Sequence, residues 1–390
     1  GFPPGMRGNR TWGYALQLYS VTSKRSWGIG DFTDLADLAT WAGNEQQAGF
    51  VLVNPLHASQ AVAPIDSSPY LPSSRRFLNP LYIRPETVPE YANLAQPTRR
   101  RIRKLRKSVR KRREVIDRDA VWEGKREALW ELFQTGRRPA RQVSLDGFRR
   151  RGGSALRDFA VWSVLSEIHG NDWRLWPEEL RDPRSAATEK FAAAQAERVE
   201  FFEWLQWTAQ QQLSAAQTAA EEAGMGVGVL ADLAVGVGKA SAETWLMGDV
   251  YAPGITVGAP PDQYNQGGQD WGQPPWNPLK LEELEYEPFR AMVRAALNRV
   301  GGLRIDHIIG LFRLWWVPEG LEPSAGTYVR YNHEALIGIL ALEAHRAQAL
   351  VVGEDLGTVE PWVREYLSRR GLLGTAILWW EYGAEGQVLP

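Results

Sequence analysis

The chain has 390 residues, 44% of them hydrophobic and 23% charged, with a formal net charge of −1 at pH 7. This is the composition of a globular protein, and the near-zero charge gives no general attraction to nucleic acid or anionic membranes. The sequence contains no cysteine, which excludes disulfides and thiolate metal sites. It shows neither an apolar run near the ~20 residues that span a bilayer nor a recognisable signal peptide, and we predict a cytoplasmic protein.

The first quarter of the chain predicts two strands and one helix. Residues 14–19 alternate between the two sides of a strand and predict the first one. Asp31 stands where it can cap a helix that begins near Phe32. Residues 50–55 predict a second strand, which a proline ends. The loop that follows, over residues 56–80, is rich in Ser, Pro and Tyr, and loops of this kind often carry functional residues.

A run of basic residues follows. Residues 99–113 contain eleven lysines and arginines in fifteen positions. Ile102, Leu105 and Val109 recur in it at helical spacing and predict an amphipathic helix. Such a run can bind nucleic acid or a membrane, but acidic residues follow at once, so we favour a solvated helix face. The helical pattern continues, and we predict a mostly helical segment over residues 91–220.

The next strand and loop carry polar and aromatic side chains. Residues 227–232 predict a third strand, in which Asp232 shares a face with Leu230 and arrives at the strand end. Residues 248–278 hold many Gly, Pro and Gln together with Trp271, and they show neither a helical nor a strand period. We predict a long irregular loop, a length that favours a functional part. A purely structural loop is the alternative.

Residues 303–306 predict a fourth strand, in which Arg304 and Asp306 share one face. A guanidinium close to a carboxylate favours the ionised form and lowers its pKa, which suits a carboxylate nucleophile. A purely structural Arg–Asp pair is the alternative interpretation.

Residues 349–353 predict a fifth strand, and Glu354 stands where this strand meets solvent. Because the chemistry of a parallel barrel gathers at the carboxyl ends of its strands, Asp306 and Glu354 are expected to face one site. Two carboxylates about 5 Å apart, one a nucleophile and one a proton donor, carry out retaining glycosyl transfer. Residues 374–380 predict a sixth strand.

The chain contains 18 tryptophans, an unusual number for its length. A tryptophan offers a flat apolar face and one N–H donor, which suits stacking on sugar rings. We expect most of them to lie in the core all the same.

Five stretches carry a likeness to a known family. They are residues 67–80 (SSPYLPSSRRFLNP), 232–236 (DLAVG), 258–264 (GAPPDQY) with 269–272 (QDWG), 304–307 (RIDH) and 353–357 (GEDLG). Together and in this order they resemble the amylomaltase family, whose members are 4-α-glucanotransferases, retaining enzymes of the α-amylase clan. The likeness extends from about Trp12 to Tyr382.

The resemblance implies an α/β fold, a (β/α)8 barrel with a helical insertion. Residues 1–90 would form the first strands and a donor-site loop, and residues 91–220 the inserted subdomain. Residues 221–390 would supply the third to sixth strands, the catalytic carboxylates and an acceptor loop over 248–278.

The resemblance also implies roles for single residues. Asp306 would be the nucleophile that Arg304 keeps ionised, and Glu354 the general acid and base. Asp232 would hold hydroxyls of the donor sugar. Tyr70 would stack on the donor ring, unless it serves only to pack its own loop.

Two further residues are candidates for substrate binding. Trp271 matches an aromatic residue of the family's acceptor site. His57, near the end of the second strand, is placed to contact a sugar hydroxyl, with an ordinary hydrogen-bonded loop histidine as the alternative. Maltooligosaccharides and α-glucans are the predicted partners, and neither a metal nor another cofactor is predicted.

The family uses a third carboxylate, an aspartate preceded by histidine after the seventh strand, and no residue here matches it. Only six of the eight strands are predicted. We therefore expect a fragment of a longer enzyme, inactive alone, with the third acid beyond residue 390. The rival functions are an α-glucan hydrolase of the same clan and a glucan-binding module without activity.

Overall fold

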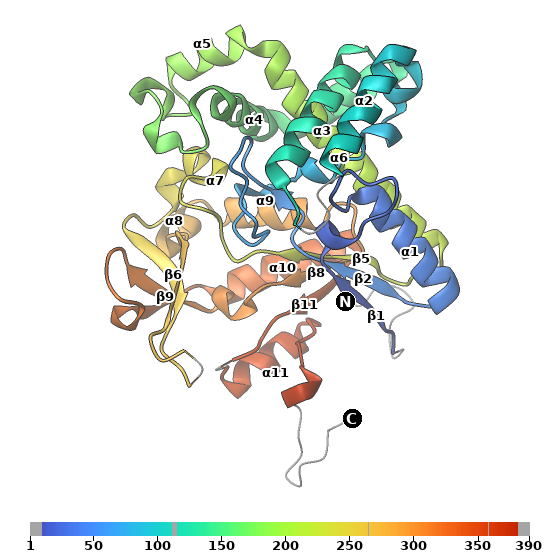
Figure 1. The fold of residues 1–390 in the computed structure, drawn as a ribbon. Helices are drawn as coiled ribbons and strands as arrows, with labels where there is room; N and C mark the ends of the chain where they lie inside the picture. The colour runs from blue at the N-terminus through green and yellow to red at the C-terminus, as the bar shows by residue number, and fades with distance from the viewer. Residues whose placement is uncertain (1–9, 111–114, 264, 358, 381–390) are drawn as a thin grey trace.

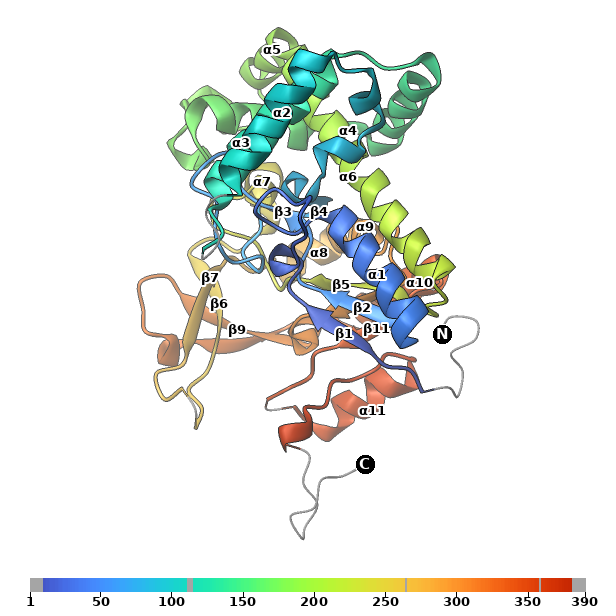
Figure 2. The ribbon, with the colours of Figure 1, turned by 45° about the vertical axis from the view of Figure 1, so that its right-hand side comes forward.

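The structure is a computed structural model that describes residues 10–110, 115–263, 265–357 and 359–380. The end of the predicted basic helix at residues 111–113 lies outside the described residues, as do Tyr264 and Tyr382 of the family likeness. Figures 1 and 2 show a sheet in the lower half of the molecule and a group of helices above it.

A parallel sheet of five strands lies at the centre, in the order β1-β2-β5-β8-β11. The strands are β1 (Gly13–Leu16), β2 (Phe50–Val53), β5 (Gly228–Leu233), β8 (Gly302–Ile305) and β11 (Leu350–Gly353). Their order in the sheet follows their order in the chain. The first five predicted strands and the α/β class are confirmed, although the first strand ends at Leu16, and residues 18–20, of which 18 and 19 were predicted as strand, form a 3-10 helix. The described residues form an open sheet between β1 and β11, not a closed barrel.

The sixth predicted strand, residues 374–380, is wrong. The described residues there form no strand, and the last three form a 3-10 turn. The N–H of Thr375 donates to Asp355 Oδ1 at 2.7 Å, and its hydroxyl donates to the carbonyl oxygen of Gly353 at 2.9 Å. Leu373, just before this segment, makes backbone hydrogen bonds with Val351 and Gly353 as a parallel strand would, but at Thr375 a bond to the Asp355 side chain replaces that ladder.

Helices lie between the strands of the central sheet along the chain, and a further one follows its last strand. They are α1 (Phe32–Gln46), α6 (Ala196–Glu222), α9 (Glu287–Ala296), α10 (His333–Ala347) and α11 (Pro361–Arg369). The helix α1 begins as predicted, because Asp31 Oδ1 accepts from the N–H groups of Thr33 at 2.9 Å and Asp34 at 3.2 Å. These N–H groups have no partner within the helix, so the cap stabilises its first turn.

Before α6 the chain is mostly helical. The helices are α2 (Gln96–Val109), α3 (Arg118–Gln134), α4 (Pro139–His169) and α5 (Ala186–Ala194). Aromatic rings fill the space between α3 and α6: Phe133, Phe201 and Trp204 lie with centroids 5.5 to 6.0 Å apart. Figure 1 shows α2 to α5 at the top of the molecule, away from β1 and β11.

The basic helix α2 is amphipathic, as predicted. Ile102 is fully buried, whereas Arg100, Arg103 and Lys104 are exposed. The charged face of α2 is therefore a solvated surface over the described residues.

A second, antiparallel sheet has the order β10-β9-β6-β7. Its strands are β6 (Ile255–Ala259), β7 (Gln269–Gln273), β9 (Arg313–Pro318) and β10 (Thr327–Arg330). The irregular loop predicted over residues 248–278 thus contains two strands, and that part of the prediction is wrong. The strand β6 pairs with β9, a partner distant in sequence that no local pattern reveals. Figure 2 shows this sheet projecting to one side of the central one.

Short elements complete the fold. The strands β3 (His57–Ala58) and β4 (Ser74–Leu78) form an antiparallel pair. The short helix α7 (Ala242–Leu246) packs on α4 and β4, and α8 (Pro278–Glu283) packs on α9. Among the helices described, none combines the length and the apolar character that crossing a membrane would need.

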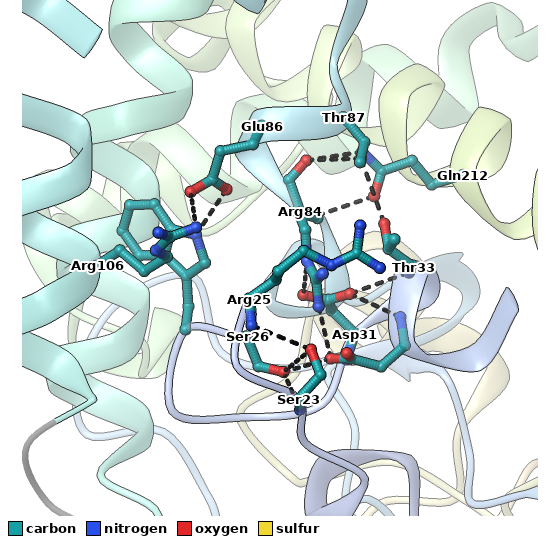
Figure 3. Close-up of polar contacts among 12 residues, drawn as sticks. Ser23, Arg25, Ser26, Asp31, Thr33, Arg84, Glu86, Thr87, Arg106 and Gln212 are labelled. Atoms are coloured by element: carbon teal, nitrogen blue, oxygen red, sulfur yellow. Dashed lines mark hydrogen bonds and ion pairs between the residues drawn. The ribbon is translucent and has the colours of Figure 1, made fainter. Parts of the chain in front are cut away.

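A buried ionic group, which we call the Arg84 cluster, consists of Arg84, Asp31, Asp34 and Lys125. Arg84 forms ion pairs with Asp31 and with Asp34, both at 2.7 Å. Lys125 of α3 donates to the carbonyl oxygen of Leu81 at 2.6 Å, and burial lowers its pKa to about 8. The cluster ties the start of α1 to the helical segment, and Figure 3 shows Asp31 and Arg84 within it.

Candidate active site

Arg304 on β8 joins two aspartates from neighbouring strand ends. Its Nη1 lies 2.7 and 2.8 Å from the two carboxylate oxygens of Asp232 and 3.0 Å from Oδ1 of Asp306. The register of β5 against β8 pairs Asp232 with Arg304, so both side chains leave the sheet on one face. The predicted contact between Arg304 and Asp306 is present, and Asp232 completes the group.

Burial sets the electrostatics of this group. The side chain of Asp232 is almost fully buried, and burial raises its pKa to about 6 although Arg304 and Tyr70 oppose the change. Burial also disfavours the charge on Arg304, but the two aspartates outweigh it and raise the arginine's pKa. The guanidinium therefore stays charged over the whole physiological range.

Tyr70 reaches the group from the loop between β3 and β4. Its hydroxyl donates to Asp232 Oδ2 at 2.8 Å, and Gln273 of β7 donates to its carbonyl oxygen at 2.9 Å. Burial and the carboxylate of Asp232 raise the pKa of Tyr70, so it remains a donor. We call Tyr70, Asp232, Arg304 and Asp306 the Arg304 cluster.

Glu354 is the first residue after β11 and lies beside this cluster. Its Oε2 accepts from the N–H of His307 at 3.0 Å, and its Oε1 accepts from the N–H of Leu356 at 2.9 Å. Its own N–H donates to the carbonyl oxygen of Ile305 at 2.9 Å. Because His307 directly follows Asp306, the structure brings the two predicted catalytic carboxylates to adjoining strand ends.

His307 is a residue to which the sequence analysis gave no role. Its backbone is left-handed, with φ 47° and ψ 57°, a conformation that few non-glycine residues adopt. Its ring packs edge-to-face on Trp271 with the centroids 5.3 Å apart, and burial lowers its pKa. Trp271 of β7 is thereby brought to the site. The only signal in the sequence was the position of His307 next to Asp306.

His57 is held separately. Its Nε2 accepts from the N–H of Ala234 at 3.2 Å, and burial lowers its pKa to about 3, so it is neutral. This hydrogen bond agrees with the alternative interpretation, in which His57 is an ordinary hydrogen-bonded histidine. Contact with a sugar hydroxyl stays a prediction.

The chemistry of the site rests on two carboxylates in different surroundings. Among the described residues, Asp306 Oδ2 has no hydrogen-bond donor, while Oδ1 is held by Arg304. Both oxygens of Glu354 accept from backbone N–H groups. A carboxylate with a free oxygen can attack a carbon atom, and a second one nearby can transfer a proton. In the part of the chain that the structure describes, no group of three or more His, Asp or Glu side chains could hold a metal ion.

Comparisons with known sequences agree on one family. A family model described as 4-alpha-glucanotransferase matches residues 16–390. The 4-alpha-glucanotransferase of Mycobacterium tuberculosis (strain ATCC 25618 / H37Rv) is 54% identical over 403 residues, which cover 100% of this chain and 55% of that protein. The enzyme of Haemophilus influenzae is 35% identical, over 97% of this chain and 56% of its own length. The chain thus spans about half the length of these relatives.

Comparisons with solved structures agree on the fold. The amylomaltase of Corynebacterium glutamicum superposes with a TM-score of 0.86 at 43% identity, over 98% of this chain and 52% of that one. The amylomaltase of Streptococcus agalactiae, in complex with acarbose, gives a TM-score of 0.81 at 19% identity, over 97% and 75%. At that lower identity the likeness concerns the fold alone.

Proposed function

The chain belongs to the 4-alpha-glucanotransferase family, and from this premise we propose that it carries the reacting carboxylates of an enzyme that transfers α-1,4-glucan segments between maltodextrins. The observation that carries the proposal is the placement of Asp306 and Glu354 at adjoining strand ends beside Arg304. The proposed partners are maltooligosaccharides and α-glucans. Acarbose, bound in the Streptococcus agalactiae amylomaltase, is the first ligand to test.

In the first step, Asp306 attacks the anomeric carbon of an α-1,4-linked glucose. The bond from this carbon to the glycosidic oxygen breaks, and Glu354 gives its proton to that oxygen as it leaves. A covalent glucosyl-enzyme remains on Asp306. Its free Oδ2 is the atom available for this attack.

In the second step, Glu354 takes the proton of the 4-hydroxyl group of an incoming sugar. The hydroxyl oxygen then attacks the anomeric carbon, and the bond to Asp306 breaks. Transfer prevails over hydrolysis when water is kept from the intermediate. We propose that Trp271, held against His307, binds the acceptor sugar and excludes water.

The other members of the Arg304 cluster position the reactants. Arg304 holds Asp306 through Oδ1 and thereby fixes which oxygen faces the sugar. Asp232 accepts from Arg304 and Tyr70 and would offer its carboxylate to donor-sugar hydroxyls. Tyr70 would also stack on the donor ring, and His57 would contact a sugar hydroxyl.

The finer architecture belongs to the same proposal. Strands in chain order with helical crossovers are what an arc of a (β/α)8 barrel requires, and we propose that the complete enzyme closes such a barrel. Residues 1–90 and 221–390 would belong to it, and residues 91–220 would form a subdomain that walls the cleft. A third carboxylate outside these 390 residues, and a cytoplasmic location, stay predictions.

Incubation with maltotriose tests the function. The 390-residue chain is assayed beside a version extended to the length of the Mycobacterium tuberculosis relative, with the products separated by chain length. We expect the extended form to make glucose and a ladder of longer maltodextrins, and Glu354→Gln to stop it.

The other outcomes distinguish the rivals. Only shorter sugars would mean a hydrolase, and binding without turnover a glucan-binding module. Turnover by the 390-residue chain alone would contradict the need for a closed barrel and a third acid.

A further inference from the structure

A second cavity lies between the central sheet and the helical segment. Its volume is about 480 Å3, and its walls come from β4, β5, β8, α4, α6 and the end of α9. Arg304, Asp306 and Glu354 do not line it, and it shares only Asp232 and His57 with the candidate active site. A cavity of this size is within the range of roughly 300–1,000 Å3 that small-molecule sites occupy.

In the part of the chain that the structure describes, five arginines contribute to the lining of this cavity, and two of them form ion pairs with acidic residues. The paired ones are Arg75, with Glu243 at 3.0 Å, and Arg294, with Glu343 at 2.8 Å. Asp232 is the one acidic residue among the described residues of the lining, and Arg304 already binds it. The walls therefore carry an excess of positive charge.

The remaining three are Arg76, Arg151 and Arg299, and we call the space that they line the arginine cavity. Among the described residues, no acceptor for their guanidinium groups is found. Arg76, on β4, is partly buried, and burial lowers its pKa. Arg151 on α4 and Arg299 after α9 are exposed. Arg151 and Arg299 are therefore solvated and free to bind a ligand, and only for the partly buried Arg76 does the missing hydrogen-bond acceptor cost free energy.

Two further features of the walls suit a polar ligand. The helix α4 is interrupted at Gly153, where φ is +56°, and helical turns restart beside Ala155, which lines the cavity. The N-terminal end of a helix carries partial positive charge and free N–H groups. Gln210 and Asn298 also line the cavity, and among the described residues their side-chain amides form no hydrogen bond.

We propose that the arginine cavity binds a small phosphorylated sugar. The planar guanidinium groups of Arg76, Arg151 and Arg299 would hold the phosphate group, because such groups donate in pairs to its oxygens. The amides of Gln210 and Asn298 would hydrogen-bond the sugar hydroxyls. Walls on several sides favour a small molecule over a nucleic acid or an acidic peptide.

This site would connect two parts of the molecule. Arg76 and Arg151 precede β5 in the chain and belong to β4 and to the helical segment, whereas Arg299 lies between α9 and β8. A phosphate group shared among them would bridge these parts. A ligand that binds only the folded state raises the melting temperature as its concentration rises.

The test measures binding of glucose 6-phosphate, inorganic phosphate and glucose to the chain by calorimetry, at constant ionic strength. The variants are Arg151→Gln and Arg299→Asn, because both residues are exposed and asparagine tolerates the left-handed backbone of Arg299, φ 70°. Arg103→Gln on the exposed face of α2 is the control for general charge attraction.

We expect saturable binding of glucose 6-phosphate, tighter than that of inorganic phosphate or glucose. Each cavity variant should weaken it at least about tenfold, as expected for the loss of one charged hydrogen-bonding group, while Arg103→Gln leaves it unchanged. Equal binding of inorganic phosphate would overturn the sugar part of the proposal. Binding that does not saturate, or that survives in both cavity variants, would overturn the site. Melting curves without ligand show that the variants are folded.

Discussion

Two arginines in this molecule each hold two aspartates, in very different surroundings. The side chains of Arg84, Asp31 and Asp34 are at most 2% exposed. In the Arg304 cluster, Asp232 is 4% exposed, but Arg304 and Asp306 are 20% and 25% exposed. The composition of the two groups is alike, and access to solvent separates them.

The hydrogen bonds of the two clusters differ less than their exposure does. Asp31 caps α1 and Asp34 accepts from Ser26, so the carboxylates of the Arg84 cluster are used for structure. Asp306 Oδ2 and the buried Asp34 Oδ1 both lack a hydrogen-bond donor among the described residues, but only Asp306 is open to solvent. A fully buried Arg–Asp pair therefore has a structural role. The same pair becomes a candidate for catalysis when one of its carboxylates is accessible to a ligand.

The largest expected effect separates the two clusters by activity. Asp306→Asn removes the proposed nucleophile and should lower maltotriose disproportionation by about 10,000-fold or more, in the form of the enzyme that is active. Because Asp306 is partly exposed, the melting temperature should change little. The control is Asp37→Asn, in the exposed pair with Arg25. Substantial remaining transfer would exclude Asp306 as the nucleophile.

The second prediction distinguishes the Arg84 cluster from the Arg304 cluster by its contribution to the free energy of unfolding. Arg84→Met leaves Asp31 and Asp34 buried without their arginine and should lower the free energy of unfolding by about 3–5 kcal/mol. Denaturant titration measures it. Arg25→Met, which breaks an exposed ion pair, should cost at most about 1 kcal/mol. Similar losses of unfolding free energy in Arg84→Met and Arg25→Met would show that the buried Arg84 cluster does not stabilise the fold.

A smaller effect concerns the hydrogen bond between Tyr70 and Asp232. Tyr70→Phe removes a donor to a carboxylate and should lower activity by about 10- to 100-fold. Because this bond lowers the pKa of Asp232, which is about 6, its loss should move the acidic limb of the pH–activity profile to higher pH. Tyr328→Phe, on the exposed strand β10, is the control. An unmoved acidic limb would assign that limb to another group.

The last effect is a pH dependence within the buried Arg84 cluster. Burial lowers the pKa of Lys125 to about 8, from the 10.5 of an unfolded chain, against the opposing influence of Asp31, Asp34 and Glu86. Between these pKa values the unfolded chain binds a proton that the folded chain does not, so this residue adds stability as pH rises.

The matched variant is Lys125→Met. The free energy of unfolding of the natural chain, relative to this variant, should increase from pH 8 to about pH 10.5. Lys104→Met on the exposed face of α2 should run parallel to the natural chain. A constant difference between the natural chain and Lys125→Met would mean that Lys125 titrates normally.

Much of the central sheet could be predicted because its information is local. Short apolar runs between turn residues indicated all five strands, and Asp31 indicated the start of α1. The apolar run near residues 374–380 looked alike but forms no strand, because Asp355 holds its backbone. The prediction failed in the opposite way at β6. An irregular loop was predicted there, but the segment forms a strand because it pairs with the distant strand β9.

The candidate site divides along the same line. Alternation along a single strand indicated that Arg304 and Asp306 lie on one face and that Asp232 ends its own strand, and the sequence alone is sufficient for that. Only the tertiary structure decided that Arg304 binds Asp232 as well as Asp306, since this depends on the register between β5 and β8. Tyr70 and Asp232 are 162 residues apart, and their hydrogen bond exists because packing brings a loop across the strand ends. Side-chain direction is a property of a short segment, whereas the choice of partner depends on how distant segments pack.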